Sequence, residues 1–237
     1  MQNGTLFLLP VPLADEAGYK SFTPFYVETI NALHTYIVEN EKTARKFLKE
    51  AGLKTPQQEL KIIDYGKHNR NQALSVYFND LKKGVDVGLM SEAGCPGVAD
   101  PGAEIVAEAH RLGIRVVPLV GPNSMLQALM ASGFSGQSYA FQGYLPIDKA
   151  ERSRKIKELE NWAMRYKQSQ IFMETPFRNN QLLDEVLKVC RADTLLCIAS
   201  HINGKEEFIK SRTIAEWGKN KPDLHKKPTV FLLYRSS

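Results

Sequence analysis

The sequence predicts two α/β domains: the first has a mostly parallel sheet with helices, and the second has a mixed sheet with helices. Up to about residue 120, short apolar runs alternate with amphipathic stretches that end at glycine, which is typical of parallel strands joined by covering helices. Beyond that point several short strands alternate apolar and polar residues, as strands of a mixed or antiparallel sheet do. We therefore expect domains of residues 1–120 and 121–237.

The elements of the first domain are predicted from apolar runs, helix caps and glycine stops. Asn40 is a typical N-cap for a helix that ends before Gly52. Asp100 and Pro101 provide an N-cap and a first-turn proline for a helix that ends before Gly113. The predicted strands are 5–9, 35–38, 60–63, 85–90 and 114–119, and the predicted helices are 41–51, 71–82 and 101–112. A further helix, 123–131, is predicted just after the domain boundary.

The second domain is less regular. The predicted strands are 139–144, 170–174, 195–200, 207–210 and 229–234, and the predicted helices are 150–164 and 179–189. We expect these helices to lie on one face of the sheet.

The composition is that of a globular protein of the cytoplasm. The chain is 43% hydrophobic and 24% charged, which disfavours disorder. Its longest apolar stretch, residues 5–14, is too short to span a bilayer, is interrupted by two prolines and lacks the basic flank of a secretory signal. Three cysteines are too few for a disulfide framework and favour a reducing compartment.

Positive charge is concentrated in the second half of the chain. Residues 121–237 contain 18 Lys and Arg against 12 Asp and Glu, whereas residues 1–120 contain 13 against 14. Such an excess favours a phosphate-bearing partner such as RNA, although a solvated basic surface without a partner explains it too. The candidates for contacts to RNA phosphates are Lys149, Arg152, Arg154 and Lys155.

Several common functional motifs are missing. The chain has no phosphate-binding G-x-x-x-x-G-K-[ST] loop, no G-x-G-x-x-G after a strand and no G-x-S-x-G nucleophile elbow. Its five histidines are too far apart in sequence for a zinc site. Cys95 has no visible base partner, and we interpret it as a small loop residue rather than a nucleophile.

Three loops follow predicted parallel strands, at the edge where open sheets bind their ligands. They are residues 10–13, 91–102 and 121–124. The second packs glycine, proline and small residues into twelve positions, which lets a backbone approach a ligand closely. Each loop alone is also explained as a tight connection, but three at one edge favour a binding site.

These segments, in this order, resemble the tetrapyrrole methylase superfamily, and within it the bacterial methyltransferases that modify a cytidine ribose 2′-hydroxyl of small-subunit ribosomal RNA. The likeness covers nearly the whole chain through residues 6–12, 91–102, 113–118, 121–122, 143–146 and 174–178. The resemblance implies a homodimeric methyltransferase that uses S-adenosylmethionine. It also implies that the donor lies in a cleft between the two domains and is held largely by main chain.

The resemblance also implies which residues form the site. The donor contacts carried over are Pro12, Leu13, Cys95, Val98, Asn123, Ser124, Met173 and Thr229. A sugar hydroxyl is a weak nucleophile, so a base or a cation must assist it, and the candidates are Glu39, His68, Glu174 and Arg178. A helix cap or an ion pair is the alternative role for each of them.

The chain departs from the family pattern mainly on the acceptor side. Charged segments of the family are replaced by residues 200–204, which include Ser200 and His201, and by Pro228. Ala14 replaces a glycine of the first loop, and residues 38–42 keep only the first acid, Glu39, of a charged family segment. Two alternatives therefore stay open: methylation of another RNA or a small molecule, and a donor-binding protein without catalysis.

Overall fold

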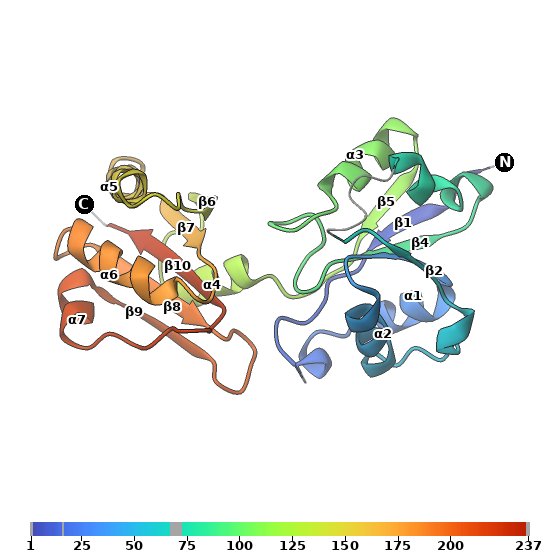
Figure 1. Ribbon diagram of the computed structural model, residues 1–237, viewed down its shortest axis with the longest axis horizontal. Coiled ribbons are helices and arrows are strands. Elements are labelled where there is room, and N and C mark those ends of the chain that lie inside the picture. Colours follow the sequence, from blue (N-terminus) through green and yellow to red (C-terminus); the bar gives the residue numbers. More distant parts are fainter. Residues whose placement is uncertain (1, 16, 67–72, 236–237) are drawn as a thin grey trace. The chain divides into compact units, whose positions relative to one another are not determined.

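The computed structural model describes residues 2–15, 17–66 and 73–235, and it divides into two compact units, Met1–Asn123 and Ser124–Ser237 (Figure 1). We call them unit 1 and unit 2. Among the described residues, no helix has both the length and the apolar character needed to cross a bilayer.

Unit 1 contains a sheet of five strands in the order β3-β2-β4-β1-β5, and every strand pair is parallel. The strands are β1 (Thr5–Leu8), β2 (Thr35–Val38), β3 (Lys61–Asp64), β4 (Val87–Met90) and β5 (Arg115–Pro118). The predicted parallel sheet is confirmed. Because β1 lies between β4 and β5, the loops that follow these three strands leave the sheet side by side.

Helices cover both faces of this sheet. They are α1 (Pro24–Ala32), α2 (Glu41–Glu50) and α3 (Ala103–Arg111). Successive strand residues face opposite sides, so Tyr36 and Val38 pack with the buried residues of α1 and α2, while Ile37 packs with those of α3. Figure 1 shows α1 and α2 on one side of the sheet and α3 on the other.

Two of the helix starts in unit 1 use side-chain caps. The Asn40 side chain accepts a hydrogen bond from the Thr43 amide (3.2 Å), as predicted for the start of α2. Thr23 caps α1 in the same way by accepting from the Tyr26 amide (3.1 Å), and Pro24 occupies the first turn. The sequence analysis missed α1, although this Thr-Pro pair is a readable start signal.

The helix predicted over residues 71–82 is wrong. Residues 71 and 72 lie outside the described residues, and the remainder forms two short 3-10 turns, η3 (Leu74–Phe78) and η4 (Leu81–Lys83). Between these turns the Asp80 carboxylate accepts hydrogen bonds from the Lys61 ammonium (2.7 Å) and the Thr35 hydroxyl (3.1 Å). These tertiary contacts override the helical pattern of the segment.

The start of α3 also differs from the prediction. Gly102 (φ +120°) occupies the N-cap position without a side-chain hydrogen bond, so Asp100 does not cap this helix. The carboxylate of Asp100 therefore does not serve as a helix cap, and it belongs to the candidate functional site.

Unit 2 contains a mixed sheet of five strands in the order β6-β7-β10-β8-β9, as predicted. The strands are β6 (Tyr139–Tyr144), β7 (Ser169–Met173), β8 (Leu195–Ser200), β9 (Phe208–Thr213) and β10 (Thr229–Tyr234). The β6–β7 pair is parallel, and the other three pairs are antiparallel. The antiparallel pairing places the end of β7, the start of β10 and the end of β8 at the same end of the sheet.

Helices cover both faces of the second sheet. They are α4 (Ser124–Ser132), α5 (Lys149–Tyr166), α6 (Asn179–Val189) and α7 (Ile214–Lys219). The predicted helices 150–164 and 179–189 share one face, as expected, whereas α4 covers the other face. Phe172 and Phe231 share one face and pack with α5, α6 and α7. Ser211 lies on the opposite face, where its hydroxyl donates to the Ser132 carbonyl at the end of α4 (2.7 Å).

Candidate functional site

The three predicted loops of unit 1 come together at the carboxyl edge of its sheet. Val11 and Gly94 exchange two backbone hydrogen bonds of 2.8 Å, which join the loop after β1 to the loop after β4. The Cys95 thiol donates to the Pro122 carbonyl (3.4 Å) and joins that loop to the one after β5. The three loops therefore form one connected backbone surface, which we call the loop cluster.

A hydrogen bond from a buried tyrosine fixes the loop cluster to the core of unit 1. The hydroxyl of Tyr26, which is buried in α1, donates to the Pro10 carbonyl (2.9 Å). Burial raises the pKa of this hydroxyl well above its ordinary value, so it remains a donor throughout the physiological range. The first loop is thus held in one position by a buried side chain.

Two glycines of the loop cluster are required by close approach or backbone conformation. A Cβ atom on Gly121 would lie 2.2 Å from the Cβ of Pro10, so only glycine permits this contact between the first and third loops. Gly94 has a φ of +73°, and a Cβ there would lie 3.5 Å from the Leu13 side chain. In these positions the glycines permit the loops to pack on one another, while the backbone around them stays accessible.

The predicted donor contacts fall into two groups. Pro12, Leu13, Cys95 and Val98 belong to the loop cluster, where Val98 is 44% exposed and the other three are half-buried. Asn123 ends unit 1 and Ser124 begins α4 of unit 2. The remaining two, Met173 and Thr229, lie at one end of the unit 2 sheet, where Met173 pairs with Val230 next to Thr229. Their contacts to a donor stay predictions.

An acidic group lies at the loop cluster, and the sequence analysis missed its central member. Asp100 is half-buried, and its pKa is raised to about 6 by burial first and then by the charges of Glu39 and Glu92. A hydrogen bond with the Ser91 side chain opposes the shift. Glu39, predicted as a candidate base, is therefore close enough to Asp100 to perturb it. The available sequence signal was an acid inside a glycine-rich loop that follows a strand. The structure adds that the preceding Ala99, a non-glycine residue, has a φ of +62°.

Two other predicted catalytic residues, Glu174 and Arg178, belong to unit 2. Glu174 follows β7, and its carboxylate forms a 2.6 Å ion pair with the Arg178 guanidinium and accepts from the Thr175 amide (2.6 Å). Its side chain is only 1% exposed, whereas that of Arg178 is 31% exposed. Glu174 therefore orients Arg178 toward the surface, which is the ion-pair alternative considered for both. His68 lies outside the described residues.

The four basic candidates for RNA contacts differ in their environment. Arg152 forms a buried ion pair with Glu185 (2.6 Å) and donates to the Ile147 carbonyl (2.8 Å), so its guanidinium is already bound by partners within unit 2. Lys155 pairs with Glu158 (3.0 Å) and lies 4.3 Å from the ring centre of Trp162. Of the four, Lys149 and Arg154 are exposed, and Lys155 is half-buried. The prediction for Arg152 is therefore wrong.

The Arg152–Glu185 pair joins α5 to α6. Burial alone would raise the pKa of Glu185, but hydrogen bonds from Ser153 and Arg152, with the positive charge of Arg152, hold that pKa below its ordinary value. The carboxylate is therefore ionised at neutral pH and neutralises a cation inside the unit. This role is structural.

The positions where the chain departs from the family pattern lie together. The His201 amide donates to the Pro228 carbonyl (3.0 Å), and the Ser200 hydroxyl donates to the same carbonyl (3.3 Å). The Thr229 hydroxyl lies 3.2 Å from that of Ser200. The departures at residues 200–204 and 228 therefore alter one corner of unit 2, beside the predicted donor contact Thr229.

Across residues 2–15, 17–66 and 73–235, no group of three His, Cys, Asp or Glu side chains is arranged to hold a metal ion. All three cysteines are free.

Residues 27–216 match the family model for tetrapyrrole (corrin/porphyrin) methylases. A protein of Bacillus subtilis called ribosomal RNA small subunit methyltransferase I is 30% identical over 214 residues, which are 90% of this chain and 68% of the relative. The protein of the same name from Buchnera aphidicola is 28% identical over 98% of this chain and 78% of its own length. The crystal structure of the methyltransferase CobJ shares the fold, with a TM-score of 0.63, 18% identity and coverage of 98% of this chain and 95% of that one.

Proposed function

The chain belongs to the tetrapyrrole methylase family and is an S-adenosylmethionine-dependent methyltransferase, and we propose that it methylates small-subunit ribosomal RNA. Two observations support this acceptor. The relatives named above carry that activity in their names, and the net positive charge of residues 121–237 suits a polyphosphate partner. The finer proposal, on the strength of the sequence resemblance, is that the methylated atom is a ribose 2′-oxygen of a cytidine.

The residues of the loop cluster fit the donor. Four residues of the second loop have a positive φ: Gly94, Gly97, Ala99 and Gly102. Such conformations point backbone N–H and C=O groups in different directions, which suits recognition of the donor by main-chain hydrogen bonds. Apolar side chains at Pro12, Leu13 and Val98 suit a flat nucleobase. The acidic Asp100 and Glu39 suit the positive charges of the sulfonium and the ammonium group.

The chemistry requires positioning and removal of one proton. When bound, S-adenosylmethionine supplies an electrophilic methyl group, and the acceptor hydroxyl must be aligned with it and lose its proton. We propose Asp100 as the general base, with Glu39 as the neighbour that raises its basicity. A carboxylate with a pKa of about 6 is ionised near neutral pH, yet it is a stronger base than an ordinary aspartate. The roles suggested for Glu174, Arg178 and His68 stay predictions.

The test of this function is transfer of a labelled methyl group to small ribosomal subunits from a bacterium that lacks the corresponding methylation. We expect label in the RNA of these subunits, at a single nucleotide whose 3′ linkage resists alkaline hydrolysis because its 2′-oxygen is methylated. Label in a base would contradict the ribose proposal. Label only in another RNA or in small metabolites would contradict the ribosomal acceptor, and binding of S-adenosylhomocysteine without any transfer would favour a non-catalytic protein.

A further inference from the structure

An exposed aromatic ring with two basic neighbours lies on unit 2, at the loop between β7 and α6. Phe177 is 66% exposed. The His225 ring meets it edge-on, with ring centres 6.0 Å apart and an interplanar angle of 76°. The Lys226 ammonium lies 5.9 Å from the centre of the Phe177 ring. We call Phe177, His225 and Lys226 the platform.

The platform is held by hydrogen bonds between the two segments that carry it. The Lys226 amide donates to the Pro176 carbonyl (2.9 Å), and the buried Asn179 side chain donates to the Lys227 carbonyl (2.6 Å). Both bonds fix the segment that carries His225 and Lys226 against the loop that carries Phe177. A ligand would therefore meet a surface that is already ordered.

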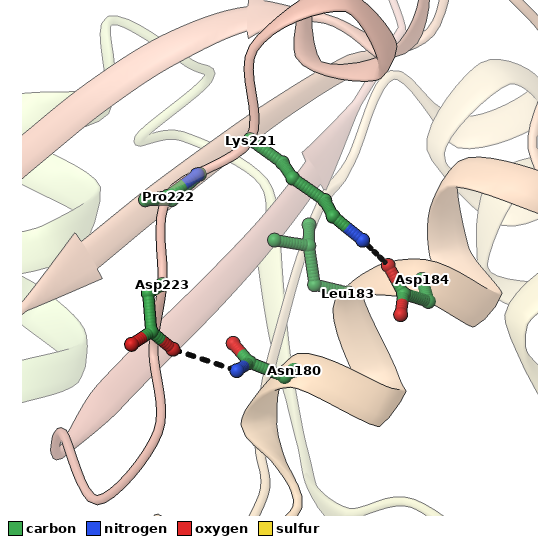
Figure 2. Close-up of a pocket in the computed structure, with 6 residues that line it drawn as sticks. All are labelled: Asn180, Leu183, Asp184, Lys221, Pro222 and Asp223. Carbon is green, nitrogen blue, oxygen red and sulfur yellow. Dashed lines mark hydrogen bonds and ion pairs between the residues drawn. The ribbon is translucent and has the colours of Figure 1, made fainter.

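Figure 2 shows a second set of bonds that holds the same segment, around a small hollow beside α6. The Asn180 side chain donates to Asp223 (2.7 Å) and accepts from the Leu224 amide (2.7 Å). Lys221 pairs with Asp184 across the hollow. These polar groups already bind one another, so we interpret the hollow as an anchor for the segment. The exposed Phe177 ring makes the platform the better candidate for binding a ligand.

The charges around the platform are predominantly positive. Arg178 and Lys227 flank it in sequence, in addition to Lys226. Two acids of the same segments already have partners. Glu174 forms an ion pair with Arg178. Asp223 accepts hydrogen bonds from the Asn180 side chain and the His225 amide. By contrast, Phe25, an exposed ring of unit 1, lines a hollow with the acids Glu28 and Asp86 and a single cation, Arg115.

From this arrangement we infer that the platform binds an unpaired nucleotide of the RNA acceptor, with its base stacked on Phe177 and a phosphate contacted by Lys226. Proteins recognise unpaired RNA by stacking splayed bases on aromatic side chains, with nearby cations on the backbone. A protein surface could also bury the ring, but it would gain nothing from the surrounding cations unless it were acidic. The inference rests on the proposed function, since it identifies how that RNA is held.

The test measures binding of a short single-stranded RNA and of the matching duplex, by fluorescence anisotropy at several salt concentrations. We expect Phe177→Leu to weaken single-strand binding between about fivefold and a hundredfold, the loss typical of one stacked base. Phe177→Tyr keeps a ring and should bind within about twofold of the unchanged protein. Lys226→Gln should reduce the slope of log affinity against log salt by about 0.7, as expected for one lost single-strand phosphate contact.

Phe25→Leu is the control, because it removes a comparably exposed ring from unit 1. It should leave RNA binding unchanged, and affinity for S-adenosylhomocysteine should be unchanged in every variant. The inference is overturned if Phe177→Leu binds single strands as tightly as the unchanged protein, or if it alters only self-association. If the unchanged protein binds RNA through Phe177 but methylates no ribosomal RNA, the proposed function fails and the platform stands. If it methylates RNA and Phe177→Leu has the same KM for that RNA, the platform alone fails.

Discussion

Asp100 is the residue on which the proposed chemistry depends. It is half-buried, and burial first, followed by the charges of Glu39 and Glu92, raises its pKa to about 6. A carboxyl group whose pKa is higher in the folded chain than in the unfolded chain stabilises the fold when it is protonated. That contribution is complete at acidic pH and is lost as the pH rises through about 6. The loop cluster thus gives up some stability at neutral pH to retain a basic carboxylate.

Replacement of the Asp100 carboxyl group allows this loss of folding stability at neutral pH to be measured. Asp100→Asn is neutral at every pH, so it should become more stable relative to the unchanged protein as the pH rises from about 4 to about 7. The free energy of unfolding in urea measures this difference. The control is Glu59→Gln, which removes the charge of an exposed acid outside the loop cluster. Methyl transfer by Asp100→Asn should fall by at least about a hundredfold. A stability difference that is equal at both pH values would contradict the raised pKa.

Single residues were predicted from the sequence with uneven success. The meeting of loops 10–13, 91–102 and 121–124 followed from strand order, because parallel strands bring their carboxyl ends to one edge. The individual residues Pro12, Leu13, Cys95 and Val98 came from the family resemblance. The burial of Arg152 was not predictable, since an arginine on a charged helix has the same local pattern whether it faces solvent or a buried glutamate.

At the scale of elements, α6 carries two neighbouring acids whose ion pairs differ greatly in burial: one pair joins α6 to α5, and the other joins it to the loop after α7. Glu185 on α6 is 6% exposed and pairs with the 11% exposed Arg152 on α5, whereas the neighbouring Asp184 is 56% exposed and pairs with Lys221. A buried pair that loses one partner leaves an uncompensated charge, whereas an exposed pair is screened by water.

We therefore expect Glu185→Ala to lower the free energy of unfolding by about 3–5 kcal/mol, and Asp184→Ala to lower it by about 1 kcal/mol or less. Urea unfolding of the two variants, which differ by one position on the same helix, measures both values. Equal losses would show that the Arg152–Glu185 pair does not hold the two helices together. Binding of S-adenosylhomocysteine by either variant at low denaturant should be unchanged.

Elements with strong local signals were predicted almost to the residue. The predicted strands 35–38, 139–144, 195–200 and 229–234 and the helix 179–189 have the observed bounds. The prediction for residues 71–82 was wrong because contacts of Asp80 with Lys61 and Thr35, distant in sequence, decide the local conformation. The short helix α7 was missed although Thr213 and Glu216 form a capping box that the sequence displays.

At the scale of the whole molecule, the chain combines a parallel-sheet unit that carries the loop cluster with a mixed-sheet unit that carries the platform and all of the excess positive charge. The fold class was predictable because it depends on strand and helix order. Asp100 and the platform were not, because each depends on side chains brought together from loops distant in sequence. The homodimer implied by the resemblance stays a prediction, which light scattering tests.

Calorimetric titration with S-adenosylhomocysteine tests the central claim, that the loop cluster binds the donor. The variants are Gly94→Val and Gly113→Val, which place the same side chain at φ +73° inside the cluster and at φ +65° outside it. We expect binding by the unchanged protein and by Gly113→Val, and a loss of at least about tenfold in affinity for Gly94→Val, where the new side chain meets Leu13 and Pro122. Absence of binding to the folded, unchanged protein, or equal affinity for all three, would contradict the account.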